Sequence, residues 1–178
     1  MIVVLTGGTG GAKLIEGLAA ETDPAELTII CNTGDDSIFH GLYVSPDIDT
    51  ITYTLAGLTD SGKGWGIKDD TFNALDQLGR LGDDTWFRLG DKDLATHITR
   101  TRFLNEGFRL SQATDRIRRA LGIEATILPM QEFRRRPSAL LLRRNRRSRA
   151  ASRATASFAV CFVPRFSRRS ASMAAANR

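Results

Sequence analysis

The chain of 178 residues has the length of one domain and is long enough to bury a core. Its formal net charge of +5 hides two unlike parts: residues 1–132 hold all 20 Asp and Glu against 12 Lys and Arg, a net charge of −8, whereas residues 133–178 hold 13 Arg and no acidic residue. Two cysteines exclude a disulfide framework, and no apolar run reaches the roughly 20 residues of a membrane span, so we expect a reduced, soluble, cytoplasmic protein.

The first thirty residues predict a strand, a helix and a second strand. Residues 2–5 (IVVL) and 27–31 (LTIIC) are β-branched runs typical of parallel strands, and the first follows Met1 too directly for a signal peptide. Between them, residues 12–20 place Leu14, Ile15 and Leu18 on one helical face. This spacing predicts a right-handed βαβ unit and an α/β fold with a parallel sheet.

A glycine-rich segment, residues 7–13 (GGTGGAK), joins the first strand to the first helix. Glycines let the backbone approach a phosphate, and the helix N-terminus favours an anion, to which Lys13 adds positive charge. The segment is neither a Walker A loop nor a complete dinucleotide fingerprint. A tight turn without a ligand is the alternative.

The polar loop 32–46 follows the second strand and begins with Asn32, Asp35 and Asp36 among its first residues. A helix is predicted over residues 47–58, with Asp47 or Asp49 in its first turn. Since the carboxyl ends of parallel strands meet at one edge, Asp35 and Asp49 are candidate Mg²⁺ ligands against a diphosphate. Turn formation and helix capping by these side chains are the alternative.

Further helices are predicted after a glycine-rich surface loop at residues 59–66. They cover residues 71–81, 94–105 and 111–121, the last with Ser111 as its N-cap and Gly122 as its end. Residues 123–129 read as a short strand. These helices form a helical insertion before that strand.

The segment 89–97 (LGDKDLATH) places Asp93 and His97 one helical turn apart, so their side chains are expected to touch. With two histidines in the chain, a zinc site is not expected, and Lys92 or His97 facing a ligand is favoured over it. A capped, solvated first turn is the alternative. Trp65 and Trp86 flank this region and could wall a flat aromatic substrate, or belong to the core.

Residues 133–178 differ in composition from the rest of the chain. They are rich in Arg, Ser and Ala, and their like charge predicts disorder. Both a genuine basic tail and a shifted reading frame in a GC-rich gene account for Arg without Lys. We therefore divide the chain into a transferase-like part at residues 1–132 and a tail at residues 133–178.

Five ordered motifs, together with ILPM at 127–130, resemble the 2-phospho-L-lactate and phosphoenolpyruvate transferases of deazaflavin coenzyme biosynthesis. The motifs are LTGGTGGAK at 5–13, NTGDD at 32–36, SPDIDT at 45–50, GWG at 64–66 and LGDKDLATH at 89–97. The resemblance implies a modified Rossmann-like fold and Mg²⁺-dependent transfer of a phospholactyl or phosphoenolpyruvyl group. The donor would be a GDP-activated acid, the acceptor the ribityl hydroxyl of the deazaflavin Fo, and GMP would leave.

Carried over residue by residue, the resemblance assigns roles to ten side chains or backbone positions. Asp35 and Asp49 would bind the metal or orient the acceptor hydroxyl, and Lys92 would lie near Fo. The remaining binding residues are Gly8, Thr9, Gly10, Gly11, Lys13, Asn32 and His97, of which the glycine-loop members would face the donor's phosphates.

The resemblance stops near Met130, before a Gly-Pro-Ser-Asn-Pro-like segment that helps hold the donor nucleotide in the family. Several strands are missing with it, so the expected sheet is truncated, with an open edge. We therefore expect the chain alone to fold poorly and to be inactive, although the family implies a homodimer. Two other functions remain open: a non-catalytic nucleotide-binding regulator of the same fold, and salt-dependent RNA or DNA binding through the Arg-rich tail.

Overall fold

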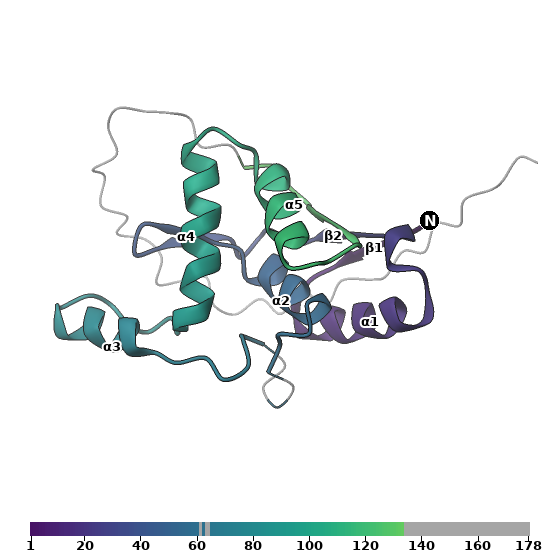
Figure 1. The fold of residues 1–178 in the computed structure, drawn as a ribbon. Helices are drawn as coiled ribbons and strands as arrows, with labels where there is room; N and C mark the ends of the chain where they lie inside the picture. Colours follow the sequence, from purple (N-terminus) through teal and green to yellow (C-terminus); the bar gives the residue numbers. More distant parts are fainter. Residues whose placement is uncertain (61, 63–64, 134–178) are drawn as a thin grey trace, which may run out of the picture.

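The computed structural model describes residues 1–60, 62 and 65–133 (Figure 1). The predicted tail from residue 134 onward, and with it nucleic-acid binding by that tail, therefore lies outside the described residues. Within the described part, no helix has both the length and the apolarity needed to cross a bilayer.

A three-stranded parallel sheet lies at the centre of the fold. It contains β1 (Ile2–Thr6), β2 (Leu27–Cys31) and β5 (Thr126–Pro129) in the order β1-β2-β5. Ile2 pairs with Leu27 and Thr28 pairs with Thr126, so all three strands run in one direction. The predicted parallel α/β sheet is confirmed, with β1 and β5 at the edges of the part that the structure describes.

Helix α1 (Gly8–Glu21) connects β1 to a short 3-10 helix, η1 (Pro24–Glu26), and begins four residues before the predicted start. The glycine-rich segment is therefore the first turn of the helix. Helix α2 (Pro46–Leu55) carries Asp47 and Asp49 in its first turn, as predicted.

The end of α2 comes three residues before the predicted residue 58. Gly57 adopts a φ of +67° after the last turn, and the Leu58 N–H donates to the Tyr53 carbonyl over 2.8 Å. Both features define a Schellman cap, which glycine permits at little steric cost.

A β-hairpin occupies part of the segment that we predicted to be a polar loop. Strands β3 (Ser37–Phe39) and β4 (Leu42–Val44) are antiparallel and joined by His40 and Gly41, whose φ angles are +49° and +78°. Two consecutive positive φ angles are typical of the type I′ turn that fits the twist of a tight hairpin. The loop prediction was wrong here because three-residue strands carry little periodic signal.

Helices α3 (Asn73–Arg80), α4 (Asp91–Asn105) and α5 (Leu110–Ala120) form the predicted helical insertion. Helix α4 begins three residues earlier than predicted. Ser111 is not the N-cap of α5, because the helix begins at Leu110, and the Arg109 N–H is held by Gln112 Oε1 at 2.9 Å. Helices α4 and α5 lie side by side, with α4 against β4 on its other side (Figure 1).

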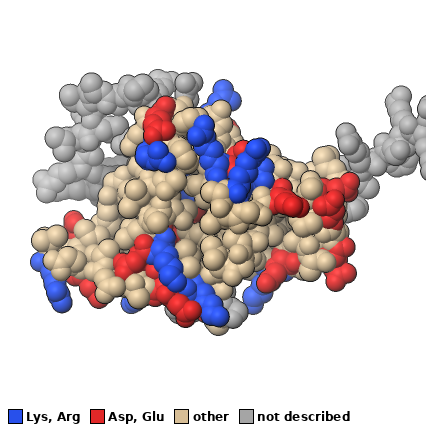
Figure 2. Space-filling model, viewed as in Figure 1, with Lys and Arg blue, Asp and Glu red and all other residues tan. Residues whose placement is uncertain are grey.

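The hydrophobic core joins the sheet to α1, α2, α4 and α5. Its fully buried members come from every one of these elements: Val4, Ile15, Ile29, Ile48, Ile51, Leu104, Leu110 and Ile127. Charged side chains also cover parts of the surface: in Figure 2, Lys and Arg side chains gather over α5 and acidic side chains gather toward the α1 side. Because α2 and α4 both contribute to this core, their positions beside the glycine turn are fixed by packing.

The close packing of α1 on β1 gives a first prediction. A Cβ added at Gly11 would lie 1.7 Å from Thr6 Oγ1, whereas one added at Gly17 of the same helix meets nothing within 4 Å. We expect Gly11→Ala to lower the free energy of unfolding in urea by about 1–3 kcal/mol through overpacking. Gly17→Ala is the matched control and should raise it by up to about 1 kcal/mol. Equal effects of the two substitutions would contradict this packing.

Candidate active site

A cavity of about 470 Å³ opens where β1 passes into α1, at the carboxyl edge of the sheet. Ligands of open α/β sheets bind along this edge. Its lining residues come from the glycine turn, from β4 and α2, from the segment around the two tryptophans and from α4: Gly8, Thr9, Val44, Pro46, Asp47, Asp49, Thr50, Tyr53, Trp65, Gly66, Trp86, Phe87, Arg88, Asp93 and His97. Segments that are far apart in the sequence thus line one cavity.

Trp65 and Trp86 line this cavity and are 45% and 61% exposed, so neither tryptophan belongs to the core. Trp86 packs edge-on against Phe39 and Phe87, whose rings stack with centroids 4.2 Å apart. Trp86 and Phe87 also line a second cavity of about 650 Å³ beside the β3–β4 hairpin. The indole faces therefore offer apolar surface to a flat ligand.

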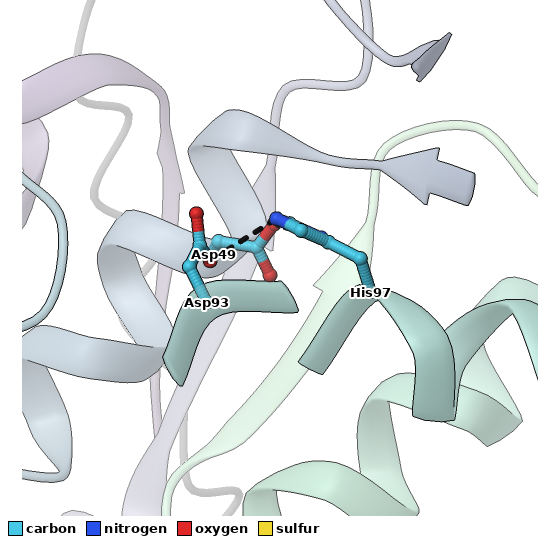
Figure 3. A group of neighbouring side chains, drawn as sticks. All are labelled: Asp49, Asp93 and His97. Atoms are coloured by element: carbon cyan, nitrogen blue, oxygen red, sulfur yellow. Dashed lines mark ion pairs between the residues drawn. The ribbon is translucent and has the colours of Figure 1, made fainter. Parts of the chain in front are cut away.

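Asp49, Asp93 and His97 converge in the first cavity, with Asp49 from α2 and the other two from α4 (Figure 3). His97 Nε2 lies 3.1 Å from Asp93 Oδ1, as the helical spacing predicted, and His97 Nδ1 lies 3.7 Å from Asp49 Oδ2. One ligand atom from each residue falls within 4.8 Å of the other two. Two carboxylates and an imidazole at this separation are able to share one metal ion.

Arg100 holds Asp49 from behind. Its two Nη atoms pair with the two carboxylate oxygens of Asp49, and Nη1 also lies 3.4 Å from His97 Nδ1. The side chains of Arg100 and Asp49 are 1% and 6% exposed. Burial lowers the pKa of Arg100, but the adjacent Asp49 carboxylate raises it above its ordinary value, so the guanidinium stays charged.

Asp93 contacts both Tyr53 and His97 through its carboxylate. Its Oδ1 accepts a hydrogen bond of 2.5 Å from the Tyr53 hydroxyl. Burial raises the pKa of Asp93, yet the contacts with His97 and Tyr53 outweigh it and lower the pKa below the ordinary value. Burial, together with the charges of Asp49 and Asp93, raises the pKa of Tyr53, which therefore stays protonated as a donor. Asp93 is thus held as a carboxylate.

Asp36 lies apart from this cluster and lines the second cavity. Its Oδ2 accepts hydrogen bonds from the Tyr43 hydroxyl at 2.9 Å and the Ser45 hydroxyl at 2.8 Å, while Oδ1 is buried without a partner among the described residues. Burial raises the pKa of Asp36 from 3.8 to about 6, against the lowering effect of the two hydroxyls. Burial thus moves the titration of this carboxyl upward from its ordinary range.

The structure brings together four of the residues predicted for the site. Gly8, Thr9, Asp49 and His97 line the first cavity. The other predicted residues do not line it: Gly10, Gly11, Lys13, Asn32, Asp35 and Lys92. Among these, Gly11 packs on Thr6, Asp35 is exposed, and the Lys92 ammonium donates to the Lys68 carbonyl over 3.0 Å.

Two residues central to the cluster, Tyr53 and Arg100, were missed from the sequence. Tyr53 is one turn after Asp49, and Arg100 is three residues after His97, so both share a helical face with a predicted site residue. That spacing was the available signal. Their partners lie on a different helix, and only the packing of α2 beside α4 brings the four together.

A glycine turn, a cavity at the carboxyl edge of a parallel sheet and a buried carboxylate and imidazole cluster define a ligand-binding α/β protein of the Rossmann-like class. Comparison with known families narrows this class, because residues 2–146 match the model of the family 2-phospho-L-lactate transferase CofD. The chain belongs to the CofD family.

The chain is similar to proteins that bear two names, and both names describe transferases. The chain is 48% identical over 134 residues to the 2-phospho-L-lactate transferase of Methanopyrus kandleri and 45% identical over 132 residues to that of Methanocorpusculum labreanum. It is 44% identical over 134 residues to the phosphoenolpyruvate transferase of Streptomyces griseus. These alignments cover 74–75% of this chain but 42–43% of the relatives, so the chain spans less than half of their length.

The buried pair between Asp49 of α2 and Arg100 of α4 gives a second prediction. Arg100→Met leaves the Asp49 carboxylate buried without its partner, which is expected to lower the free energy of unfolding by about 3–5 kcal/mol. Arg102→Met on the same helix is the control, because Arg102 pairs with Glu106 at 3.4 Å on the surface and should cost under about 1 kcal/mol. Urea unfolding measures both. Similar losses of unfolding free energy in the two variants would show that the buried pair stabilises the fold no more than the surface pair does.

The raised pKa of Asp36 gives a third prediction. Because its pKa is higher in the folded state, Asp36 contributes stability that is fully present below pH 3.8 and is lost as the pH rises through about 6. The substitution Asp36→Asn removes this titration. As the pH rises from 4 to about 7, the free energy of unfolding of the variant should therefore increase relative to that of the original chain. Urea unfolding across that range measures the difference, and a difference that stays constant with pH would refute it.

Proposed function

We propose that the chain carries the acceptor and metal side of a transferase site. The reaction would move a 2-phospholactyl or phosphoenolpyruvyl group from a GDP-activated donor to the ribityl hydroxyl of Fo. The hydroxyl oxygen would bond to the donor's phosphorus, the bond to the guanosine phosphate would break, and GMP would leave. The observation that carries the proposal is the single cavity in which the glycine turn, two tryptophans and the Asp49, Asp93 and His97 cluster meet.

The tryptophans support binding of a flat acceptor. Trp65 and Trp86 are both large, partly exposed and placed on the lining of one cavity, whose volume of about 470 Å³ suits a small organic ligand. Stacking on an indole needs only a planar π-system, as the deazaflavin ring of Fo provides. The acceptor hydroxyl would then extend from the ring toward α4.

The chemistry of the cluster fits Mg²⁺ in part. Mg²⁺ takes oxygen ligands and commonly uses one or two carboxylates together with water and substrate phosphates, which Asp49 and Asp93 provide for. An imidazole is not a preferred ligand, so we assign His97 to orient Asp93, which its Nε2 approaches to 3.1 Å. Once bound, the ion would neutralise charge that develops on the transferred phosphoryl oxygens. Asp35, exposed in its loop, stays a predicted ligand without support from this cluster.

The chain's own residues would act mainly by positioning. Arg100 fixes both oxygens of Asp49, and Tyr53 fixes Asp93, so neither carboxylate needs to reorganise when substrates bind. Gly8 and Thr9 line the same cavity and would form part of its wall beside the donor. Phosphoryl transfer depends largely on such positioning and on charge neutralisation, and needs no covalent enzyme intermediate.

The transferred acid, the oligomeric state and the location of the protein are part of the same proposal. The proposal covers transfer of either acid, because relatives of both names match the chain, at 44% and 48% identity. A homodimer and a cytoplasmic location, both predicted from the sequence, remain predictions. The remaining donor contacts would come from the region that the relatives have beyond their match to this chain.

Binding of Fo tests the proposal first, because it needs only the described cavity. We expect saturable quenching of tryptophan fluorescence by Fo, and an approximately tenfold weaker affinity for Trp65→Ala, since stacking on an aromatic side chain is worth about 1–3 kcal/mol. Leu81→Ala is the control, because Leu81 is 74% exposed and does not line the cavity. A chain that binds GDP but not Fo would favour a non-catalytic nucleotide-binding protein.

Transfer itself is measured by GMP release from the GDP-activated donor in the presence of Fo and Mg²⁺. Activity that is lost in Asp49→Asn and retained in Leu81→Ala would support the assignment. Binding of Fo without transfer would mean that the described part holds the acceptor but lacks the remaining donor contacts.

A further inference from the structure

Asp47 connects three segments at the mouth of the cavity. It lies in the first turn of α2, yet its carboxylate reaches the glycine turn, where Oδ1 accepts a hydrogen bond of 2.7 Å from the Gly8 N–H. Its Oδ2 accepts a hydrogen bond of 2.9 Å from Asn32 Nδ2, in the loop after β2. Both carboxylate oxygens are therefore engaged within the protein.

The backbone of the glycine turn is fitted to this carboxylate. A Cβ added at Gly7 would lie 2.7 Å from Asp47 Oδ2 and 3.0 Å from Asn32 Cβ. Gly7 is the N-cap of α1 and has no side chain to cap the helix itself, and Gly8 adopts a φ of +69°. The absence of a side chain at position 7 thus makes room for an internal carboxylate.

Both polar atoms of the Asn32 amide make hydrogen bonds within the protein. Its Nδ2 donates to Asp47, and its Oδ1 accepts a hydrogen bond of 3.0 Å from the Gly34 N–H. The amide therefore holds Asp47 against the turn, and the predicted role of Asn32 as a binding residue stays a prediction.

The N-terminus of a helix attracts an anion through its free N–H groups and its dipole. At α1 a fixed carboxylate already fills this role at Gly8. A phosphate that approached the same N–H would meet an occupied donor and a negative charge at hydrogen-bond distance from it. The attraction that a glycine turn usually offers to phosphate is thus cancelled at this point.

We propose that Asp47 is a specificity-determining residue that occupies the anion position at the Gly8 amide and excludes phosphate from it. This inference rests on the proposed function only in taking the cavity as a site for a phosphate-bearing donor. The donor's phosphates then lie further into the cavity, beyond Gly8 and toward Asp49 and Asp93, where a cation is required to offset the carboxylates. Asp47 acts on where the charge of the ligand is placed, without touching the reacting atoms.

The test uses the full chain, labelled with ¹⁵N, and inorganic pyrophosphate as the probe. In the original chain the Gly8 amide resonance should not shift as pyrophosphate is added. The substitution Asp47→Ala removes both the charge and the acceptor of the Gly8 N–H, so the Gly8 resonance should shift saturably and the affinity for pyrophosphate should rise roughly tenfold. Asp47→Asn removes the charge but keeps an amide oxygen as an acceptor, so it should act in the same direction more weakly and serves as the second variant if Asp47→Ala does not fold.

Glu16→Gln is the matched control, because Glu16 carries the same charge as Asp47 and lies on α1, the helix that Gly8 begins, but is exposed and lines a different cavity. It should leave both the Gly8 resonance and the affinity unchanged. A shift of Gly8 in the original chain, or variants at Asp47 that bind pyrophosphate no more tightly, would overturn the proposal. Since pyrophosphate contains neither Fo nor guanosine, a failed transfer assay leaves this result untouched, and the reverse also holds.

Discussion

The bidentate pair between Asp49 and Arg100 connects α2 to α4 inside the protein, and the arrangement of the site depends on it. Both side chains are removed from water, which is costly for an ion unless its partner is close and well oriented. Arg100 meets this condition with two parallel contacts, and its Nη1 also lies near His97 Nδ1 and, at 3.5 Å, the Tyr43 carbonyl of β4. One buried guanidinium thus fixes a helix, a hairpin strand and an imidazole relative to one carboxylate.

The cavity concentrates negative charge on one wall, and the structure compensates each carboxylate in a different way. Asp49 has a guanidinium behind it, Asp93 has an imidazole and a phenol, and Asp47 has the N-terminus of α1. Compensation from within the protein lets three carboxylates coexist in a small volume.

Much of this molecule follows from local sequence patterns. The β-branched runs predicted β1 and β2, and the i, i+4 spacing predicted the contact between Asp93 and His97. The hairpin at His40 and Gly41 was missed because its strands are too short for alternation to show. The contributions of Tyr53 and Arg100 were missed because they depend on contacts between helices that are far apart in sequence, which no local pattern encodes. The glycine turn was recognised, but its nearest anion comes from the chain itself.

The strand order β1-β2-β5 has a consequence for how the chain is assembled. Strand β2 lies in the middle of the described sheet, yet its partner β5 is synthesised about a hundred residues after it. Throughout that interval one side of β2 has no strand to pair with, while the helices that carry Asp49 and Arg100 emerge from the ribosome. Closing so long a loop is entropically unfavourable and slow, so the βαβ half has to wait, exposed, for its last strand. Until β5 is made, the unpaired edge of β2 is a place where another strand is able to pair.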